Sequence, residues 1–94
     1  FQEKFVYMLK EISRNYMEKG NYQQTINYAQ KVLKEDPCDQ EAYCLIMESY
    51  FIQGKSEQVV RHYLLCSQTL QEEVDIKPSR KVTEIYLKAR GEQT

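Results

Sequence analysis

One spacing recurs in this chain and constrains its fold more than any other feature. The positions of Gly20 and Gly54 differ by 34 (54 − 20), and so do those of Tyr16 and Tyr50 (50 − 16). A fixed period of this size is the signature of repeat architectures, in which each unit buries its apolar face only by stacking on a neighbour. We therefore expect two copies of one supersecondary unit.

Apolar residues follow the spacing of amphipathic helices throughout the chain. They recur at intervals of three and four residues in five segments, which marks one face of an α-helix. The stripes are Phe5, Leu9, Ile12 and Tyr16; Tyr22, Ile26, Ala29 and Leu33; Tyr43, Ile46 and Tyr50; Val59, Tyr63, Cys66, Leu70 and Val74; and Val82, Ile85, Tyr86 and Ala89. No segment indicates a β-strand. The spacing predicts an all-α fold.

Glycine and proline separate the predicted helices. Gly20, Gly54 and Gly91 follow three of the stripes, and glycine ends a helix easily because it adopts left-handed backbone angles without steric cost. Pro37 follows the second stripe, and proline disfavours helical geometry in the residue before it. The short turns predict antiparallel helix pairs.

The chain length suits one small domain. With 94 residues it is within the range of a single hydrophobic core. We expect residues 1–94 to form one domain, with helical hairpins at about residues 2–36 and 39–74 and a closing helix at about 79–90. The first residue is Phe1 rather than methionine, and we expect the chain to be a segment of a longer protein.

The period and the pattern resemble the tetratricopeptide repeat, a helical hairpin of about 34 residues whose first helix has a large residue, leucine, glycine and tyrosine in order. The matching residues are Leu9, Ile12, Ser13 and Tyr16 in the first unit and Tyr43, Ile46, Met47 and Tyr50 in the second. The match is incomplete, because tryptophan is absent and Gln71 stands where the second unit should have proline. The fourth helix is therefore expected to continue toward Val74.

The second half of the chain resembles the end of the bacterial transcriptional activator domain. The segment YLLCSQTLQEEVDIKPSRKVTEIY combines an aromatic residue, a leucine-rich helix, two acids, a short loop with proline and a last helix with threonine and tyrosine. The matching residues are Tyr63, Leu70, Glu72, Glu73, Pro78, Thr83 and Tyr86. The family's Leu-Gly after the acids is Val74-Asp75 here, which predicts a less tightly turned loop.

This resemblance, which spans about Phe5 to Leu87, implies a non-catalytic regulatory domain that makes protein contacts. In that family the domain lies C-terminal to a winged-helix DNA-binding domain and serves in contacts between protomers or domains. The implied partners are other domains of the same regulator or a second copy in a homodimer, with DNA bound only through an upstream domain. The alternative is a tetratricopeptide adaptor that binds a peptide segment of a protein unrelated to transcription.

Charge and cysteine content argue against several other classes of protein. The formal net charge is −1, and neither the chain nor its mildly basic end has the strong basic footprint of a phosphate-binding domain. The chain has three cysteines, Cys38, Cys44 and Cys66. An odd number without a C-x-x-C pair fits a reducing, cytoplasmic setting rather than a disulfide framework. No apolar run approaches the roughly 20 residues that span a membrane.

Few residues are candidates for chemistry. His62 and Cys66 lie one helical turn apart, but two ligands are fewer than the four of a structural zinc site, and Cys66 belongs to a core stripe. The adjacent acids Glu72 and Glu73 diverge by about 100° on a helix and do not converge on one substrate atom. We expect no enzyme activity, no metal or other cofactor, and no small-molecule ligand.

The inner surface of the repeat stack is the candidate protein-contact face. In tetratricopeptide stacks the first helix of each hairpin lines the concave side, which predicts a face made of Tyr7, Lys10, Arg14, Met17, Glu41, Cys44, Glu48 and Phe51. We expect the cations of the first unit to face the acids of the second. We also expect Met17 and Phe51 to lie close together, because they occupy the same position in successive repeats. The alternative is that the closing helix or an upstream segment covers them.

Overall fold

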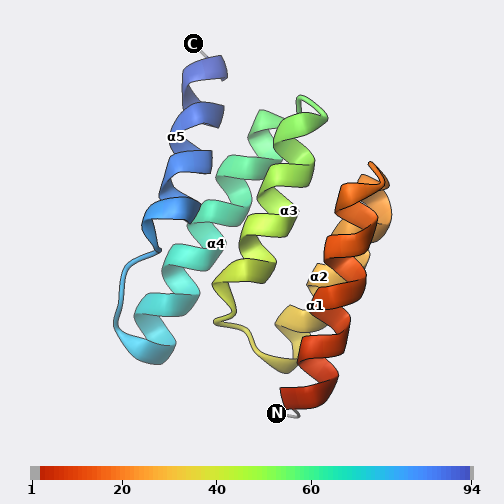
Figure 1. The fold of residues 1–94 in the computed structure, drawn as a ribbon. Coiled ribbons are helices and arrows are strands. Elements are labelled where there is room, and N and C mark those ends of the chain that lie inside the picture. Colours follow the sequence, from red (N-terminus) through yellow and green to blue (C-terminus); the bar gives the residue numbers. More distant parts are fainter. Residues whose placement is uncertain (1–2, 94) are drawn as a thin grey trace.

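Five α-helices make up most of residues 3–93, the part of the chain that the computed structural model describes (Figure 1). They are α1 (Glu3–Glu18), α2 (Tyr22–Glu35), α3 (Gln40–Ile52), α4 (Ser56–Val74) and α5 (Arg80–Gln93). No strand occurs among these residues. The predicted all-α fold of helical hairpins is confirmed.

The helices stack in one direction, from the α1–α2 hairpin to α5 (Figure 1). Helix α3 packs against both helices of the first hairpin, and α5 packs against both α3 and α4. The product is a flat body that measures 41 × 35 × 17 Å. Helix α5 therefore packs against the second hairpin in the way that α3 packs against the first.

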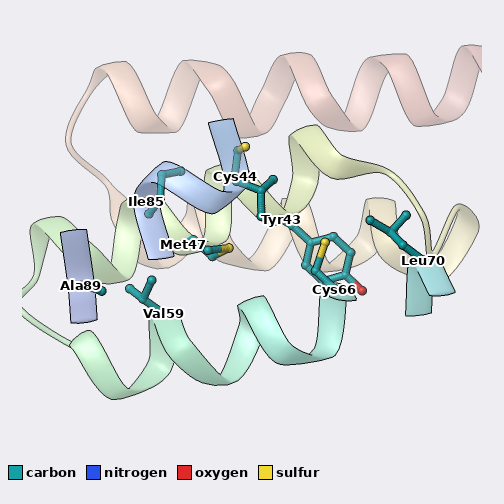
Figure 2. Close-up of a cluster of buried hydrophobic side chains, with 9 residues drawn as sticks. Tyr43, Cys44, Met47, Val59, Cys66, Leu70, Ile85 and Ala89 are labelled. Carbon is teal, nitrogen blue, oxygen red and sulfur yellow. The ribbon is translucent and has the colours of Figure 1, made fainter. Parts of the chain in front are cut away.

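Two apolar clusters hold the stack together. The first lies between α1, α2 and α3 and contains Val6, Leu9, Ile26, Ala29, Val32, Ala42, Leu45 and Ile46. The second joins α3, α4 and α5, and Figure 2 shows Tyr43, Met47, Cys66 and Ala89 among its members. Because α3 contributes to both clusters, it is the central element of the fold.

The two glycines that share a position in the repeat have the predicted conformation. Gly20 and Gly54 both have a φ of 76°, in the left-handed region. In each turn the glycine N–H donates to the carbonyl three residues back, and the next N–H donates to the carbonyl five residues back. This is the Schellman arrangement, which satisfies the last carbonyls of a helix. The sequence prediction for both helix ends is confirmed.

Helix α4 ends on a left-handed residue that is not glycine. It continues to Val74, as predicted, and Asp75 then adopts φ 53° and ψ 45° while its N–H donates to the Leu70 carbonyl. Asp75 thus adopts left-handed angles, which aspartate tolerates better than most residues do. The expectation of a less tightly turned loop than in the family stays a prediction.

Asp75→Gly is expected to stabilise the chain by about 0.5–1 kcal/mol. Glycine removes the steric cost of the left-handed angles, and the change also removes a negative charge from the C-terminal end of α4, where the helix dipole disfavours it. The exposed hydrogen bond from Gln71 to Asp75 is lost, at small cost. Chemical denaturation measures the difference; an Asp75→Gly chain less stable than the parent would contradict this account of the turn.

The stripe predicted for α1 is not the buried one. The buried residues of α1 are Val6, Leu9 and Ser13, whereas Phe5 is 40 % exposed and Ile12 and Tyr16 are partly exposed. The predicted stripe lies on the neighbouring face of the helix, and only Leu9 belongs to the core. Residue spacing alone could not distinguish these faces, because both are apolar.

Helix α5 continues past its predicted end. It runs to Gln93, so Gly91 lies inside the helix rather than after it. One internal glycine costs only about 1 kcal/mol of helix propensity, and the packing of Val82, Ile85 and Ala89 against α3 and α4 holds the helix in place. Val74, which had been assigned to a core stripe, is half exposed at the end of α4.

Candidate protein-contact face

Helices α1, α3 and α5 line one side of the stack, which we call the α1/α3/α5 face. It contains two shallow depressions. One, of about 320 Å³, is lined by Glu48, Phe51, Ile52, Lys81, Glu84, Ile85 and Lys88. The other, of about 240 Å³, is lined by Arg14, Met17, Glu18, Glu41, Cys44, Leu45, Glu48 and Lys81. Because Glu48 and Lys81 border both depressions, the two form one continuous surface.

The predicted contact residues are distributed over this face. Six of them line the two depressions, and Met17 and Phe51 lie in different ones. The other two, Tyr7 and Lys10, line a separate depression of about 270 Å³ at the start of α1. The predicted residues therefore line three hollows, two of which adjoin, and the closeness of Met17 and Phe51 stays a prediction.

Ion pairs join α1 to the start of α3. The Lys10 ammonium lies 2.8 Å from Asp39 Oδ2 and 3.6 Å from Glu41 Oε1. The Arg14 guanidinium donates to both carboxylate oxygens of Glu41, over 2.5 and 2.8 Å. Asp39 Oδ1 also accepts from the Ala42 backbone N–H at 3.0 Å and so caps α3. These charges satisfy one another within the chain.

The pairing shifts the pKa values of its members. Hydrogen bonds from Arg14 lower the pKa of Glu41 below its ordinary value, and they outweigh the effect of burial. Burial lowers the pKa of Lys10. The hydrogen bond to Asp39 and the negative charges of Asp39 and Glu41 raise it by more, so the pKa of Lys10 lies above its ordinary value. Both shifts favour the charged forms of Glu41 and Lys10, which keeps α1 and α3 joined at this edge.

Glu41→Gln is expected to cost less than about 1 kcal/mol at neutral pH, because the pair is partly exposed. The pKa of Glu41 is lower in the folded chain than the ordinary 4.5, so its stabilisation is present above pH 4.5 and is lost as the pH falls through the folded value. Urea denaturation at several pH values should show the difference in stability between the two chains disappear as the pH falls through the lowered folded pKa of Glu41. A difference that persists at low pH would contradict the ionic origin, and the exposed Glu35→Gln is the control.

The uncharged residues of the face are more covered than the sequence predicted. Cys44 is only 5 % exposed and belongs to the second apolar cluster, although it borders a depression. Burial raises the pKa of its thiol to about 11, so it stays protonated at neutral pH and packs as a small apolar group. Phe51 packs against the same cluster, and Met17 packs against the first. The alternative that α5 covers part of Phe51 is consistent with this placement.

A family comparison decides where this fold belongs. The family model described as the bacterial transcriptional activator domain matches residues 1–90, nearly the whole chain. The chain belongs to this family. The resemblance drawn from its second half is confirmed, and with it the association with transcriptional regulators. No curated protein and no solved structure gives a significant match.

Cys66 and His62 of this activator domain have surroundings that explain them structurally. Cys66 is fully buried beside Tyr43 (Figure 2), as its place in the core stripe predicted, and burial raises the pKa of its thiol to about 12. His62 donates from Nδ1 to the Gln58 carbonyl at 2.8 Å, and its ring lies 5.4 Å from that of Tyr50. Within residues 3–93 no three His, Cys, Asp or Glu side chains lie close enough together to hold a metal ion.

The larger depression of the activator domain is also lined by residues that the sequence prediction did not include. Ile52, Lys81, Ile85 and Lys88 line the larger depression, but α5 had been treated only as a closing helix. The signal was present in the sequence: residues 81, 85 and 88 have helical spacing and lie on one side of α5. None of the helices in the described part of the domain is long and apolar enough to cross a membrane.

Proposed function

We propose that this activator domain is a non-catalytic module that makes protein contacts for a bacterial transcriptional regulator in the cytoplasm. Residues 1–94 act as one unit of that longer protein. Its partners are other domains of the same regulator or a second copy of the chain, and DNA is bound through a different domain. Membership of the family favours this function over that of an adaptor unrelated to transcription.

One observation carries the proposal: the α1/α3/α5 face is hollowed and has an apolar floor bordered by charges of both signs. Phe51 and Ile85 form the floor of the larger depression, and Ile52 at its edge is 55 % exposed. Lys81 and Lys88 border it from α5. An apolar centre with a polar rim is the usual anatomy of a protein interface, where a few anchors supply most of the affinity.

The experiment mixes the purified chain with the remaining domains of its regulator, expressed as a separate protein, and follows binding by calorimetry. A chain with Ile52→Glu and Lys81→Glu is expected to bind at least tenfold more weakly, since both side chains border the larger depression. Both residues are exposed, so the fold should be unchanged by circular dichroism. Leu64→Glu, an exposed position on α4, is the matched control. Undiminished binding by the double variant would refute the proposed face.

A further inference from the structure

An apolar stripe on α1 has no covering element within residues 3–93. Helix α1 lies at one end of the stack and, in this part of the chain, packs against α2 and α3 only (Figure 1). The stripe consists of Met8, which is 52 % exposed, and the partly exposed Ile12 and Tyr16. The Tyr16 ring stacks on the ring of Tyr28 from α2, with 5.8 Å between the centroids, which widens the apolar surface. We call Met8, Ile12 and Tyr16 the α1 stripe.

The next repeat shows what residues at these positions contact. Ala42, Ile46 and Tyr50 of α3 follow the three stripe residues by 34 positions (42 − 8, 46 − 12 and 50 − 16). All three pack in the apolar cluster between α1, α2 and α3, where Ala42 and Ile46 are fully buried. In this fold these positions are therefore the ones with which the first helix of a unit packs onto the hairpin before it.

The opposite end of the stack has a different surface. Along α5, from Arg80 to Arg90, the exposed side chains are charged except for that of Leu87. The outermost element of a repeat stack needs such a polar surface, because no further unit shields it from water. Helix α1 has the apolar surface of an internal element instead.

Within residues 3–93 neither hairpin has an open groove that could receive the α1 stripe. Helix α3 packs against both helices of the first hairpin, and α5 packs against both helices of the second. A second copy of this chain therefore offers no equivalent of the surface that α3 uses. The segment that precedes α1 in the longer protein is joined to it directly. The link between α2 and α3, residues 36–39, shows that a few residues suffice for such a connection.

The rim of this expected contact differs from the rim between α1 and α3. Asp39 and Glu41 of α3 bind cations of α1. The equivalent positions of α1 hold Phe5 and Tyr7 (39 − 34 and 41 − 34). Both side chains are exposed, that of Tyr7 by 57 %. A unit that packs onto α1 therefore meets aromatic groups at its rim, whereas α1 meets carboxylates at the corresponding place.

We propose that the α1 stripe is the docking surface for a helical hairpin formed by the segment directly upstream of α1 in the longer protein. The hairpin presents an apolar groove to the stripe, and at its rim it carries apolar side chains in place of the lysine and arginine that α1 uses. This contact shares no residue with the two depressions of the α1/α3/α5 face. The proposed function and this docking can therefore fail independently.

Thiol labelling of the longer protein and of residues 1–94 tests the proposal. The thiol introduced by Met8→Cys is expected to react about tenfold or more slowly in the longer protein, because it is covered there and reacts only when the contact opens. Leu64→Cys, at a similarly exposed position on α4, should react at the same rate in both proteins. Mass spectrometry of the labelled peptides separates these thiols from the partly exposed Cys38.

Three results would overturn the docking. The first is an equal labelling rate for Met8→Cys in both proteins. The second is slow labelling that appears only as the protein concentration rises, since a second copy would then cover the stripe. The third is slow labelling that persists when only the segment directly upstream of α1 is deleted, since a different domain of the regulator would then cover it.

The apolar character of the rim has a separate test. Tyr7→Cys is expected to be protected in the longer protein about as strongly as Met8→Cys. This protection should change by less than about twofold between about 0.1 M and about 1 M salt, a range over which charge interactions become strongly screened. Protection that is lost at high salt would show that the upstream hairpin binds this rim through charges, contrary to the proposal.

Discussion

Ile46→Ala is expected to lower the free energy of unfolding by about 3 kcal/mol. Ile46 is fully buried in the cluster that joins α3 to the first hairpin. Truncation removes its apolar burial and leaves a cavity between three helices, none of which can collapse without disturbing the other contacts. In a domain of this size, each kcal/mol lowers Tm by roughly 4–8 °C, so the expected fall in Tm is about 12–24 °C. Such a loss is a large part of the total stability.

Ile12→Ala is the matched control, because Ile12 is the repeat equivalent of Ile46 but is only partly buried. The same truncation there should cost less than half as much. Thermal and urea denaturation of the two variants compare the positions directly. Equal losses would show that Ile12 is as buried as Ile46, which would contradict the partial exposure described for Ile12.

Ser13→Leu is expected to destabilise the chain by about 2–4 kcal/mol, the sum of a lost hydrogen bond and overpacking. Ser13 is fully buried where α1 meets α2, and its hydroxyl donates to the Thr25 carbonyl at 2.8 Å. A leucine loses this hydrogen bond, at about 1 kcal/mol. It also adds bulk to a close helix contact, and overpacking of this kind costs about 1–3 kcal/mol.

Ser13→Ala separates the two contributions, since it removes the hydroxyl without adding volume. It should cost only about 1 kcal/mol. Chemical denaturation gives the unfolding free energies of both variants. The difference between them is the cost of placing a larger side chain where α1 and α2 approach each other. If alanine and leucine were equally destabilising, the spacing of α1 and α2 would not limit the side chain at this position.

The sequence predicted the helices well because their ends depend on local chemistry. Gly20 and Gly54 end α1 and α3 through their own backbone freedom, and Pro37 follows α2. Which face of α1 is buried could not be predicted in this way. In a repeat stack the first helix of a hairpin has two apolar faces, one toward its own hairpin and one toward the preceding unit. The spacing of Phe5, Ile12 and Tyr16 does not show which face is covered.

The prediction of the contact face from the repeat covered only the residues to which the repeat applied. The register of the repeat led to Arg14 and Glu41, which the structure brings together. It could not lead to Lys81 or Ile85, because α4 has 19 residues and α2 has 14, so α5 lies outside the register. The second role of Asp39, which caps α3 and also binds Lys10, depends on a contact between residues far apart in the sequence.

The ion pairs of Lys10 and Arg14 hold the first hairpin to the second along one rim, while the apolar contacts lie behind them. Salt weakens these two kinds of contact unequally. The distance over which charges interact falls from about 10 Å at 0.1 M salt to about 3 Å at 1 M. Apolar contacts do not depend on this screening length. High salt is therefore expected to weaken the contact along this rim, while the apolar contacts behind it keep the two hairpins packed.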